Sequence, residues 1–162
     1  MPVYRQELWI SRSLDEVFGF FCKAEKLEMI TPPWVQFRIE SPPPIEMREG
    51  ALIDYRLRVH GFPLRWRTGI DVWEPPHRFV DRQIKGPYRQ WIHEHRFSVK
   101  DGGTLVEDEV TYQVPGGWLV DRLFVRRDVE RIFAHRSQAL RRHFGMGNDD
   151  GSPAASMTRC PE

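Results

Sequence analysis

Three runs of residues with strand character fill residues 78–114, RFVDRQIKGPYRQWIHEHRFSVKDGGTLVEDEVTYQV. Alternation of apolar and polar residues predicts three strands: residues 78–84, 88–99 and 104–114. A tight turn at residues 85–87 joins the first two strands, and residues 100–103 join the second and third. The second connection contains Asp101-Gly102, and an Asp-Gly pair between alternating runs is among the strongest hairpin signals. The stretch therefore predicts three consecutive antiparallel strands.

One face of the second and third predicted strands mixes apolar and titratable side chains. Successive residues of a strand point to opposite faces, so every second residue shares a face. With the turn centred on Asp101-Gly102, the predicted register has three facing pairs: His95 with Asp108, His93 with Val110, and Trp91 with Tyr112. Because an unpaired buried charge is costly, this face predicts either a core with one satisfied polar pair or the wall of a ligand-binding cavity.

The rest of the chain adds strands before this stretch and a helix after it. Further strands are predicted by alternation: residues 3–10, 35–40, 51–60 and 64–73. Ser13, with Glu16 three residues later, predicts the capped start of a short helix, and a second short helix over residues 24–30 ends at Pro32-Pro33. After residue 117 the period changes to 3.6, which predicts a long amphipathic helix over residues 119–143.

The long helix is predicted to cover the sheet. Its apolar stripe consists of Leu119, Leu123, Phe124, Ile132, Phe133, Leu140 and Phe144. Its other face interleaves arginines with acidic residues, which favours a solvated surface over a nucleic-acid site. The order of elements predicts an α+β fold in which a seven-stranded antiparallel sheet wraps around this helix, with two short helices after the first strand.

Length and composition bound the class of protein. With 162 residues, 40% of them hydrophobic and 29% charged, we expect one domain over residues 1–147 and a disordered tail over residues 148–162, which are rich in Gly, Asp, Ser, Pro and Ala. A formal net charge of +1 gives no reason to expect nucleic-acid binding. Two cysteines and no apolar run near about 20 residues predict a cytoplasmic protein without stable membrane insertion.

Short motifs along residues 3–144 resemble a known family. They include Thr31-Pro32-Pro33-Trp34, Trp66-Arg67-Thr68, Pro75-Pro76, Gly86-Pro87-Tyr88, the run Trp91, His93, His95 and Phe97, the run Asp108, Val110 and Tyr112, and Phe133 with Arg136. This set resembles the SRPBCC superfamily, with its Bet v 1/START-like helix-grip fold, and most closely its bacterial polyketide cyclase/dehydrase-like branch. The resemblance implies a cavity between sheet and helix that binds a lipid, polyketide or isoprenoid-like molecule.

The candidate ligand-binding residues come from the inward faces of these elements. They are Tyr55, Trp66, Trp91, His93, His95, Asp108, Tyr112, Phe133 and Arg136. Aromatic residues form cores by default, and in a cavity fold they also line the ligand. Arg136 neighbours Phe133 on the inner stripe of the helix, where it would reach a carboxylate of Asp108 or of a ligand.

A catalytic alternative rests on His95 and Asp108. A carboxylate fixes the tautomer of an imidazole, so His95 would act as general acid–base and Asp108 would orient it. A structural His–Asp pair is the competing interpretation. Asp81 would approach His93 if residues 86–88 form a three-residue loop, but that register stays open by one residue, which would reverse the face.

No metal or other cofactor is expected. A metal site needs three or four ligands, and Asp108 is the only carboxylate placed with His93 and His95 by the predicted register. The leading hypothesis is a binding protein for a hydrophobic small molecule. The alternatives are a cyclase or dehydratase and a protein-interaction module beside an oxidoreductase, with a protein partner or homodimer, a filled cavity and an exposed apolar patch near Trp34 and Trp118.

Overall fold

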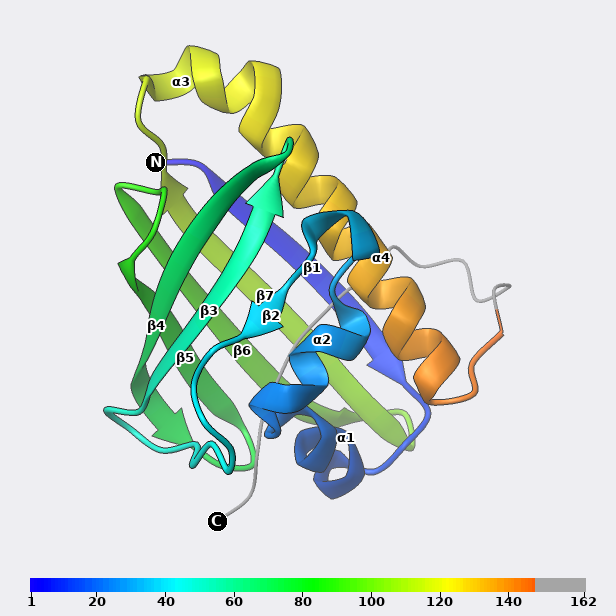
Figure 1. Ribbon diagram of the computed structural model, residues 1–162. Coiled ribbons are helices and arrows are strands. Elements are labelled where there is room, and N and C mark those ends of the chain that lie inside the picture. Colours follow the sequence, from blue (N-terminus) through cyan, green and yellow to red (C-terminus); the bar gives the residue numbers. More distant parts are fainter. Residues whose placement is uncertain (148–162) are drawn as a thin grey trace.

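Seven antiparallel strands form one curved sheet in the computed structural model, which describes residues 1–147 (Figure 1). The strand order is β1-β7-β6-β5-β4-β3-β2. The strands are β1 Val3–Ile10, β2 Arg38–Ile39, β3 Leu52–Val59, β4 Phe62–Glu74, β5 Arg78–Lys85, β6 Gln90–Lys100 and β7 Gly103–Gln113. The expected α+β architecture is confirmed. The tail predicted over residues 148–162 lies outside the described residues.

Short helices follow β1, and a long helical segment ends the described chain. The first group consists of α1 Leu14–Phe21, the 3₁₀ helix η1 Ala24–Lys26, α2 Leu27–Ile30 and the 3₁₀ helix η2 Pro33–Val35. The long segment is α3 Gly117–Val120, the π-helical η3 Asp121–Val125 and α4 Arg126–His143. The Ser13 side chain accepts a hydrogen bond from the backbone N–H of Glu16 and caps α1, as predicted. The sheet curves around α4 (Figure 1).

The β6–β7 hairpin has the predicted register. Asp101 and Gly102 have φ of 48° and 74°, and two consecutive positive φ values are typical of the tight hairpin turn that an Asp-Gly pair favours. The facing pairs are His95 with Asp108, His93 with Val110, and Trp91 with Tyr112. Two histidines and one aspartate are thereby placed on the face of the sheet that α4 covers.

The tight turn predicted between β5 and β6 is wrong. Lys85 still belongs to β5, and the chain bends over residues 86–89. The Gln83 side chain holds this bend, because its Nε2 donates to the carbonyl oxygen of Tyr88 at 2.8 Å and its Oε1 accepts from the Tyr88 N–H at 3.2 Å. In the resulting register Asp81 faces His93 directly, so a second carboxylate joins the histidines.

The strand predicted over residues 35–40 is shorter than expected. Pro33–Val35 form a 3₁₀ turn, and Gln36 adopts a left-handed conformation with φ of 47°, which ends the extended run. Only Arg38 and Ile39 pair with β3. Val35 and Phe37 are nevertheless buried, and Phe37 packs against Tyr55 of β3 with ring centroids 4.7 Å apart.

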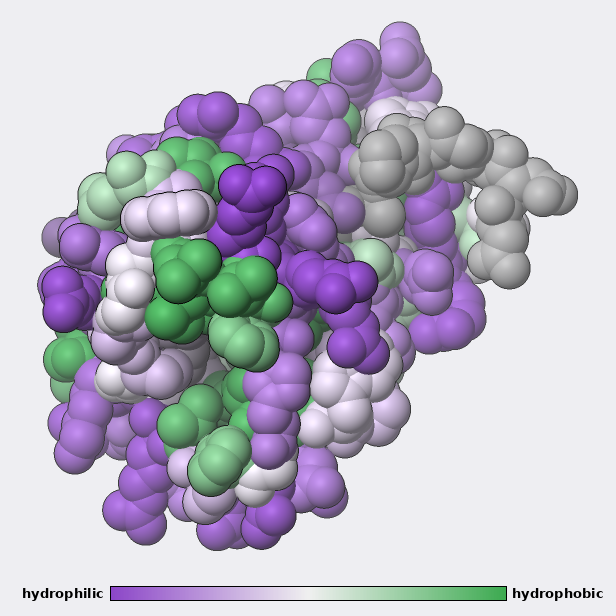
Figure 2. Space-filling view, turned by 90° about the horizontal axis from the view of Figure 1, so that it is seen from above, coloured by the Kyte–Doolittle hydropathy of each residue, from purple (hydrophilic) through white to green (hydrophobic). Residues whose placement is uncertain are grey.

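The predicted apolar stripe of the long helix is correct only for its C-terminal part. Phe133, Leu140 and Phe144 are buried, whereas Leu119, Leu123 and Phe124 are more than half exposed. The α3 end of the long segment projects beyond the strand ends (Figure 1), and Val120 and Val125, rather than these three residues, pack toward Tyr112 of β7. With Trp118, these three residues form an exposed apolar patch, and Figure 2, which looks down on this end, shows hydrophobic residues gathered there among hydrophilic ones.

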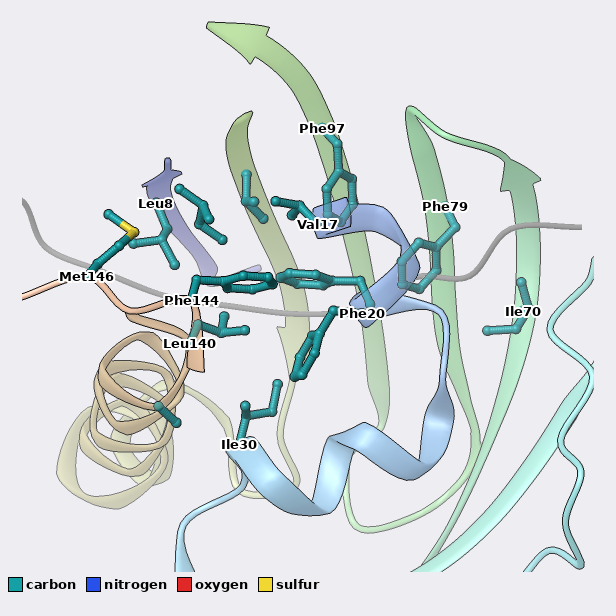
Figure 3. Packing of buried hydrophobic residues seen from close by; sticks show 14 of the residues in the cluster. Leu8, Val17, Phe20, Ile30, Ile70, Phe79, Phe97, Leu140, Phe144 and Met146 are labelled. Atoms are coloured by element: carbon teal, nitrogen blue, oxygen red, sulfur yellow. The ribbon is translucent and has the colours of Figure 1, made fainter. Parts of the chain in front are cut away.

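The tightly packed core occupies the opposite end, around α1. Phe20, Phe21 and Phe144 pack there against Leu140, Ile30 and residues of β1, β6 and β7, as Figure 3 shows for the labelled side chains. Aromatic edge-to-face contacts of this kind, with ring centroids 5.0–5.9 Å apart for Phe21–Phe97 and Phe18–Phe97, add to the stability from buried area. This core leaves the middle of the sheet to be covered by α4.

Candidate functional site

A cavity of about 350 Å³ lies between the sheet and the long helix. That volume is within the range of small-molecule sites, roughly 300–1,000 Å³. Seven of the nine predicted ligand-binding residues line it: Tyr55, Trp66, Trp91, His93, His95, Phe133 and Arg136. Val120 and Val125 of α3 and η3 border it as well, so the cavity extends toward the exposed apolar patch.

Aromatic rings form one wall of the cavity. Trp66 stacks on Tyr55 with ring centroids 6.0 Å apart and meets Trp91 and Tyr88 edge-on, each at 5.5 Å. The polar groups of Trp66 and Tyr55 both hydrogen-bond Thr68. Trp66 Nε1 donates to Thr68 Oγ1 at 3.0 Å, and the Tyr55 hydroxyl lies 3.0 Å from the same oxygen. Burial raises the pKa of Tyr55 well above its usual value, so the wall is apolar and uncharged at neutral pH.

Two histidines and two aspartates form a polar cluster beside this wall. The imidazole rings of His93 and His95 lie 3.7 Å apart, centroid to centroid. On the inner side, His93 Nε2 and His95 Nδ1 lie 2.8 and 3.0 Å from Oδ1 of Asp108. On the outer side, His95 Nε2 and His93 Nδ1 lie 2.8 and 3.7 Å from Oδ2 of Asp81. Each imidazole therefore has one nitrogen toward each carboxylate.

The cluster has an inner and an outer carboxylate. The Asp108 side chain is fully buried and does not line the cavity, whereas the Asp81 side chain is 18% exposed and does. Sequence reasoning named Asp108 as the partner of His95, but the hydrogen-bonded neighbour of Asp108 is His93, and His95 hydrogen-bonds Asp81. The rings lean diagonally across the strands, which a register of backbone positions does not reveal.

Asp81 is the functional candidate that the sequence prediction left out of its site. The alternation along β5 could have indicated Asp81, since Asp81 lies two residues after Phe79 and therefore on the same, inner face of the strand. Only the register after the following bend decided whether it would meet His93, and β5 and β6 pair in the register that a three-residue loop over residues 86–88 gives, with Asp81 opposite His93. The cluster has four members because of this register.

Burial favours the uncharged forms within the cluster. Removal from water lowers the pKa of His93 well below its usual value, and the neighbouring His95 lowers it further, against the attraction of Asp81. Burial also raises the pKa of Asp81, opposed by the charges of His93 and Arg136. Desolvation therefore disfavours the charged form of both groups.

Arg136 brings a cation to the cavity from α4. Its guanidinium lies over the ring of Phe133, 5.3 Å from the centroid. Burial lowers its pKa to about 10, against the attraction of Tyr55, Asp108 and Asp81. Among the described residues, no hydrogen-bond acceptor reaches its buried Nε. The predicted direct bond to Asp108 is not among the contacts of Arg136, which leaves its Nε–H as a donor without an acceptor in residues 1–147.

Tyr112 is the other predicted ligand-binding residue that does not line the cavity. Its side chain is buried against Val110, Val114, Val129 and Phe133. Its phenol is directed to Asp121, whose hydrogen bond and charge add to burial in raising the pKa of Tyr112. Tyr112 thus supports the wall formed by Trp91 and Tyr88, with ring centroids 5.9 and 6.0 Å away.

Comparison with known proteins gives one family and many similar folds. The family model described as polyketide cyclase/dehydrase and lipid transport matches residues 10–141. Major latex-like protein 151 from Panax ginseng is 14% identical, with a TM-score of 0.62 over 88% of this chain and 97% of that one. Protein Ms6760 from Mycobacterium smegmatis is 16% identical, with a TM-score of 0.63 over 88% of each chain.

A third solved structure, the di-domain ARO/CYC protein StfQ from the steffimycin biosynthetic pathway, is 17% identical. Its TM-score is 0.62 over 80% of this chain and 46% of that one. At such identities these likenesses show the fold alone. A search of curated proteins gave no match. Within residues 1–147, no helix combines the length and apolar character needed to cross a membrane.

Proposed function

This chain belongs to the polyketide cyclase/dehydrase and lipid-transport family, and from this premise we propose that it binds a hydrophobic small molecule in the cavity between sheet and α4. A lipid, polyketide or isoprenoid-like molecule would place its apolar part against the aromatic wall and its polar end at the histidine–aspartate cluster and Arg136. The helix-grip, Bet v 1-like fold supports this proposal. We further propose that residues 1–147 act as one ligand-binding domain.

The observation that carries the proposal is a largely apolar cavity that is lined by a few polar groups. Trp66, Trp91 and Phe133 supply apolar surface, while Asp81 and Arg136 supply opposite charges. Ligand sites are mostly apolar with a few placed polar groups that fix orientation. A cavity serving only as packing would leave its lining without contacts, which destabilises a fold by about 24 cal/mol per Å³ of empty space.

Native mass spectrometry of the gently purified protein tests the proposal. We expect a bound hydrophobic compound, or a rise in melting temperature when fatty acids, isoprenoids and aromatic polyketides are added, because a ligand that binds only the folded state stabilises it. A ligand at 100 times its dissociation constant adds about 2.7 kcal/mol. The proposal would be contradicted if no hydrophobic compound copurified and none of these classes raised the melting temperature.

An enzymatic role is the second candidate, favoured by the position of His95 and Asp81 on the cavity wall. A cyclase or dehydratase of polyketide-like substrates would use His95 as acid–base, with its ring held by Asp81 and Asp108. The catalytic pair foreseen from the sequence, His95 with Asp108, thereby gains Asp81 as the member that faces the substrate. Loss of a general base slows a reaction by about 10²–10⁴-fold, so an unchanged rate in His95→Gln would remove this role.

The interaction-module hypothesis is contradicted in one part. It required a filled cavity, whereas about 350 Å³ is open. Its other requirement, an exposed apolar patch near Trp118, is met, with Trp118 72% exposed. Trp34 is also half exposed, with its ring beside His135 and under the guanidinium of Arg131. A protein partner or a homodimer therefore has the Trp118 patch and the Trp34 side chain as candidate surfaces.

A further inference from the structure

We infer that the outer side of the polar cluster is a binding site for a divalent transition-metal ion, with Asp81, His93 and His95 as its ligands. These three residues can each offer one ligand atom within 4.8 Å of the others. The expectation of no metal rested on one available carboxylate, Asp108. The structure adds Asp81 and so completes a set of two imidazoles and one carboxylate.

The donor atoms already have nearly the spacing of a metal site. His95 Nε2 and His93 Nδ1 lie 2.8 and 3.7 Å from Asp81 Oδ2. Metal–ligand bonds of about 2.1 Å separate neighbouring ligand atoms by about 3.0 Å in octahedral and about 3.4 Å in tetrahedral geometry. The two distances to Asp81 would therefore change by less than about 1 Å, and the third separation, between the two histidine ligand atoms, which is within 4.8 Å, would close by up to about 1.8 Å.

Asp108 occupies the position of a supporting residue behind the ligands. A histidine that binds a metal through one nitrogen usually gives its other N–H to a carboxylate or carbonyl, which fixes the tautomer and the ring orientation. Asp108 Oδ1 lies 2.8 Å from His93 Nε2, with which it forms a hydrogen bond, and 3.0 Å from His95 Nδ1. Asp108 can thus hold His93 with its Nδ1 lone pair toward Asp81, whereas His95 Nε2, which is hydrogen-bonded to Asp81 at 2.8 Å, would exchange that bond for the metal.

A proton and a metal ion are the two possible occupants between His95 Nε2 and Asp81 Oδ2, which lie 2.8 Å apart. A neutral His95 with its N–H on Nε2 forms this contact as a hydrogen bond, and a metal ion would take the place of that proton. The two occupants are distinguishable, because only the metal can be titrated in and removed by a chelator.

The charges and the cavity define the metal and its fourth ligand. Imidazole with carboxylate suits zinc or ferrous iron, whereas magnesium and calcium prefer oxygen ligands. Asp81 and Asp108 contribute two negative charges and Arg136 one positive charge, so a divalent ion leaves the site at +1. An anionic fourth ligand, such as hydroxide or the oxygen of a cavity-bound acid, would neutralise it from the cavity side, which Asp81, His93 and His95 all line.

Cobalt(II) titration of chelator-treated protein, followed by visible absorption, tests the inference. We expect one equivalent of saturable binding that zinc reverses. Asp81→Asn and His95→Ala should each weaken binding at least tenfold, and Asp108→Asn, which changes only a supporting residue, by about 10–100-fold. His60→Ala is the matched control, since it removes an exposed His–Asp pair, His60 with Asp128 at 2.6 Å, and should leave cobalt binding unchanged.

Proton NMR of the cobalt-loaded wild-type protein covers the case in which a variant does not fold. Two exchangeable, hyperfine-shifted imidazole N–H signals are expected, one from the nitrogen of each histidine that does not bind the metal. The inference would be overturned if cobalt binding were not saturable, or if the cobalt-loaded protein lacked both imidazole N–H signals. Unchanged cobalt affinity in folded Asp81→Asn and His95→Ala would overturn it as well. None of these readouts uses a hydrophobic ligand, so their failure leaves the proposed ligand binding to its own test. A bound ion would also use the lone pair that His95 needs as a base.

Discussion

Arg136 connects the polar side of the cavity with the chemistry of its ligand. Its guanidinium is held over Phe133, while its Nε–H points to no acceptor among residues 1–147. Burial lowers its pKa only to about 10, so Arg136 is charged at neutral pH. A buried charge without a full set of hydrogen bonds is stabilised when a ligand supplies an anionic oxygen.

Replacement of Arg136 by methionine should therefore change the preference for the polar end of the ligand. We expect Arg136→Met to weaken binding of a medium-chain fatty acid by about 10–100-fold, the value of a charge-assisted hydrogen bond of about 1.5–3 kcal/mol. Binding of the alcohol with the same chain should change less than about threefold. Isothermal titration of both ligands measures the difference. Arg127→Met, on the exposed face of α4, is the control, and an equal loss for acid and alcohol would contradict the assignment.

The residues of the site show where sequence reasoning reaches its limit at this scale. The pairs His95–Asp108 and His93–Val110 followed from the Asp101-Gly102 turn alone, because a two-residue turn fixes register. Asp81 was not assigned, since an unpredicted side-chain contact from Gln83 sets the length of the β5–β6 bend. The diagonal contacts of His93 and His95 depend on ring orientation, which alternation along a strand does not specify.

At the scale of elements, the β6–β7 hairpin is fixed against β1 by a close backbone approach at Gly103. A Cβ at Gly103 would clash with the carbonyl oxygen of Ile10 and lie 2.8 Å from the indole of Trp9. Trp9 in turn donates from Nε1 to the carbonyl oxygen of Lys100 at 2.8 Å. The hairpin that carries both histidines is thus positioned by a site that accepts only glycine.

Two glycine replacements should have opposite effects on stability. Gly103→Ala forces a clash with backbone, and overpacking of this kind typically costs about 1–3 kcal/mol. Gly19→Ala lies inside α1 with no atom within 4 Å of the new Cβ, so it should stabilise the protein by about 0.5–1 kcal/mol. Urea unfolding midpoints compare the two variants. A Gly103→Ala variant as stable as the wild-type protein would show that β1 and β7 do not approach as described.

Element type was more predictable than element environment. The long helix was foreseen within two residues at its start and correctly at its end, because a 3.6-residue period persists throughout it. Exposure of Leu119, Leu123 and Phe124 was not foreseen, since periodicity identifies one face of a helix and does not reveal where the underlying sheet ends. The five-residue π-helical turn η3, which shifts the phase of the stripe, also has no signal in the pattern.

At the scale of the whole molecule, all four tyrosines of the chain are buried or half-buried around the cavity. Burial is the first cause that raises the pKa of each: Tyr4 to about 12, and Tyr55, Tyr88 and Tyr112 higher still. Because tyrosines of the unfolded chain ionise near pH 10, the folded state binds more protons above that pH. The free energy of unfolding is therefore expected to fall as the pH rises through 10.

Absorbance at 295 nm measures this behaviour directly. The folded protein should show no tyrosinate with a midpoint near pH 10, and ionisation should appear only near pH 12 or together with unfolding. In concentrated guanidinium chloride the same chain should titrate near pH 10. A native-state titration near pH 10 would place at least one of these tyrosines in water and contradict the described packing around the cavity.

The sheet and its covering helix were predictable as an architecture, whereas the cavity was not. Alternation on β4 identifies Leu64, Trp66 and Thr68 as inward-facing, but it does not show whether α4 packs against them or leaves space. That space arises because the aromatic core collects around α1, while the middle of α4 faces Trp66 and Trp91 across the cavity. The central claim about this protein is that a hydrophobic molecule binds in this cavity.

A titration of two tryptophan variants with a fluorescent hydrophobic probe, such as anilinonaphthalene sulfonate, tests that claim most directly. Leu64 lines the cavity, and its neighbour Arg65 is exposed on the outer face of β4. With both variants shown to be folded by circular dichroism, Leu64→Trp should fill the cavity and weaken probe binding at least tenfold, whereas Arg65→Trp should bind like the wild-type protein. Equal affinity in Leu64→Trp and Arg65→Trp would contradict binding inside the cavity.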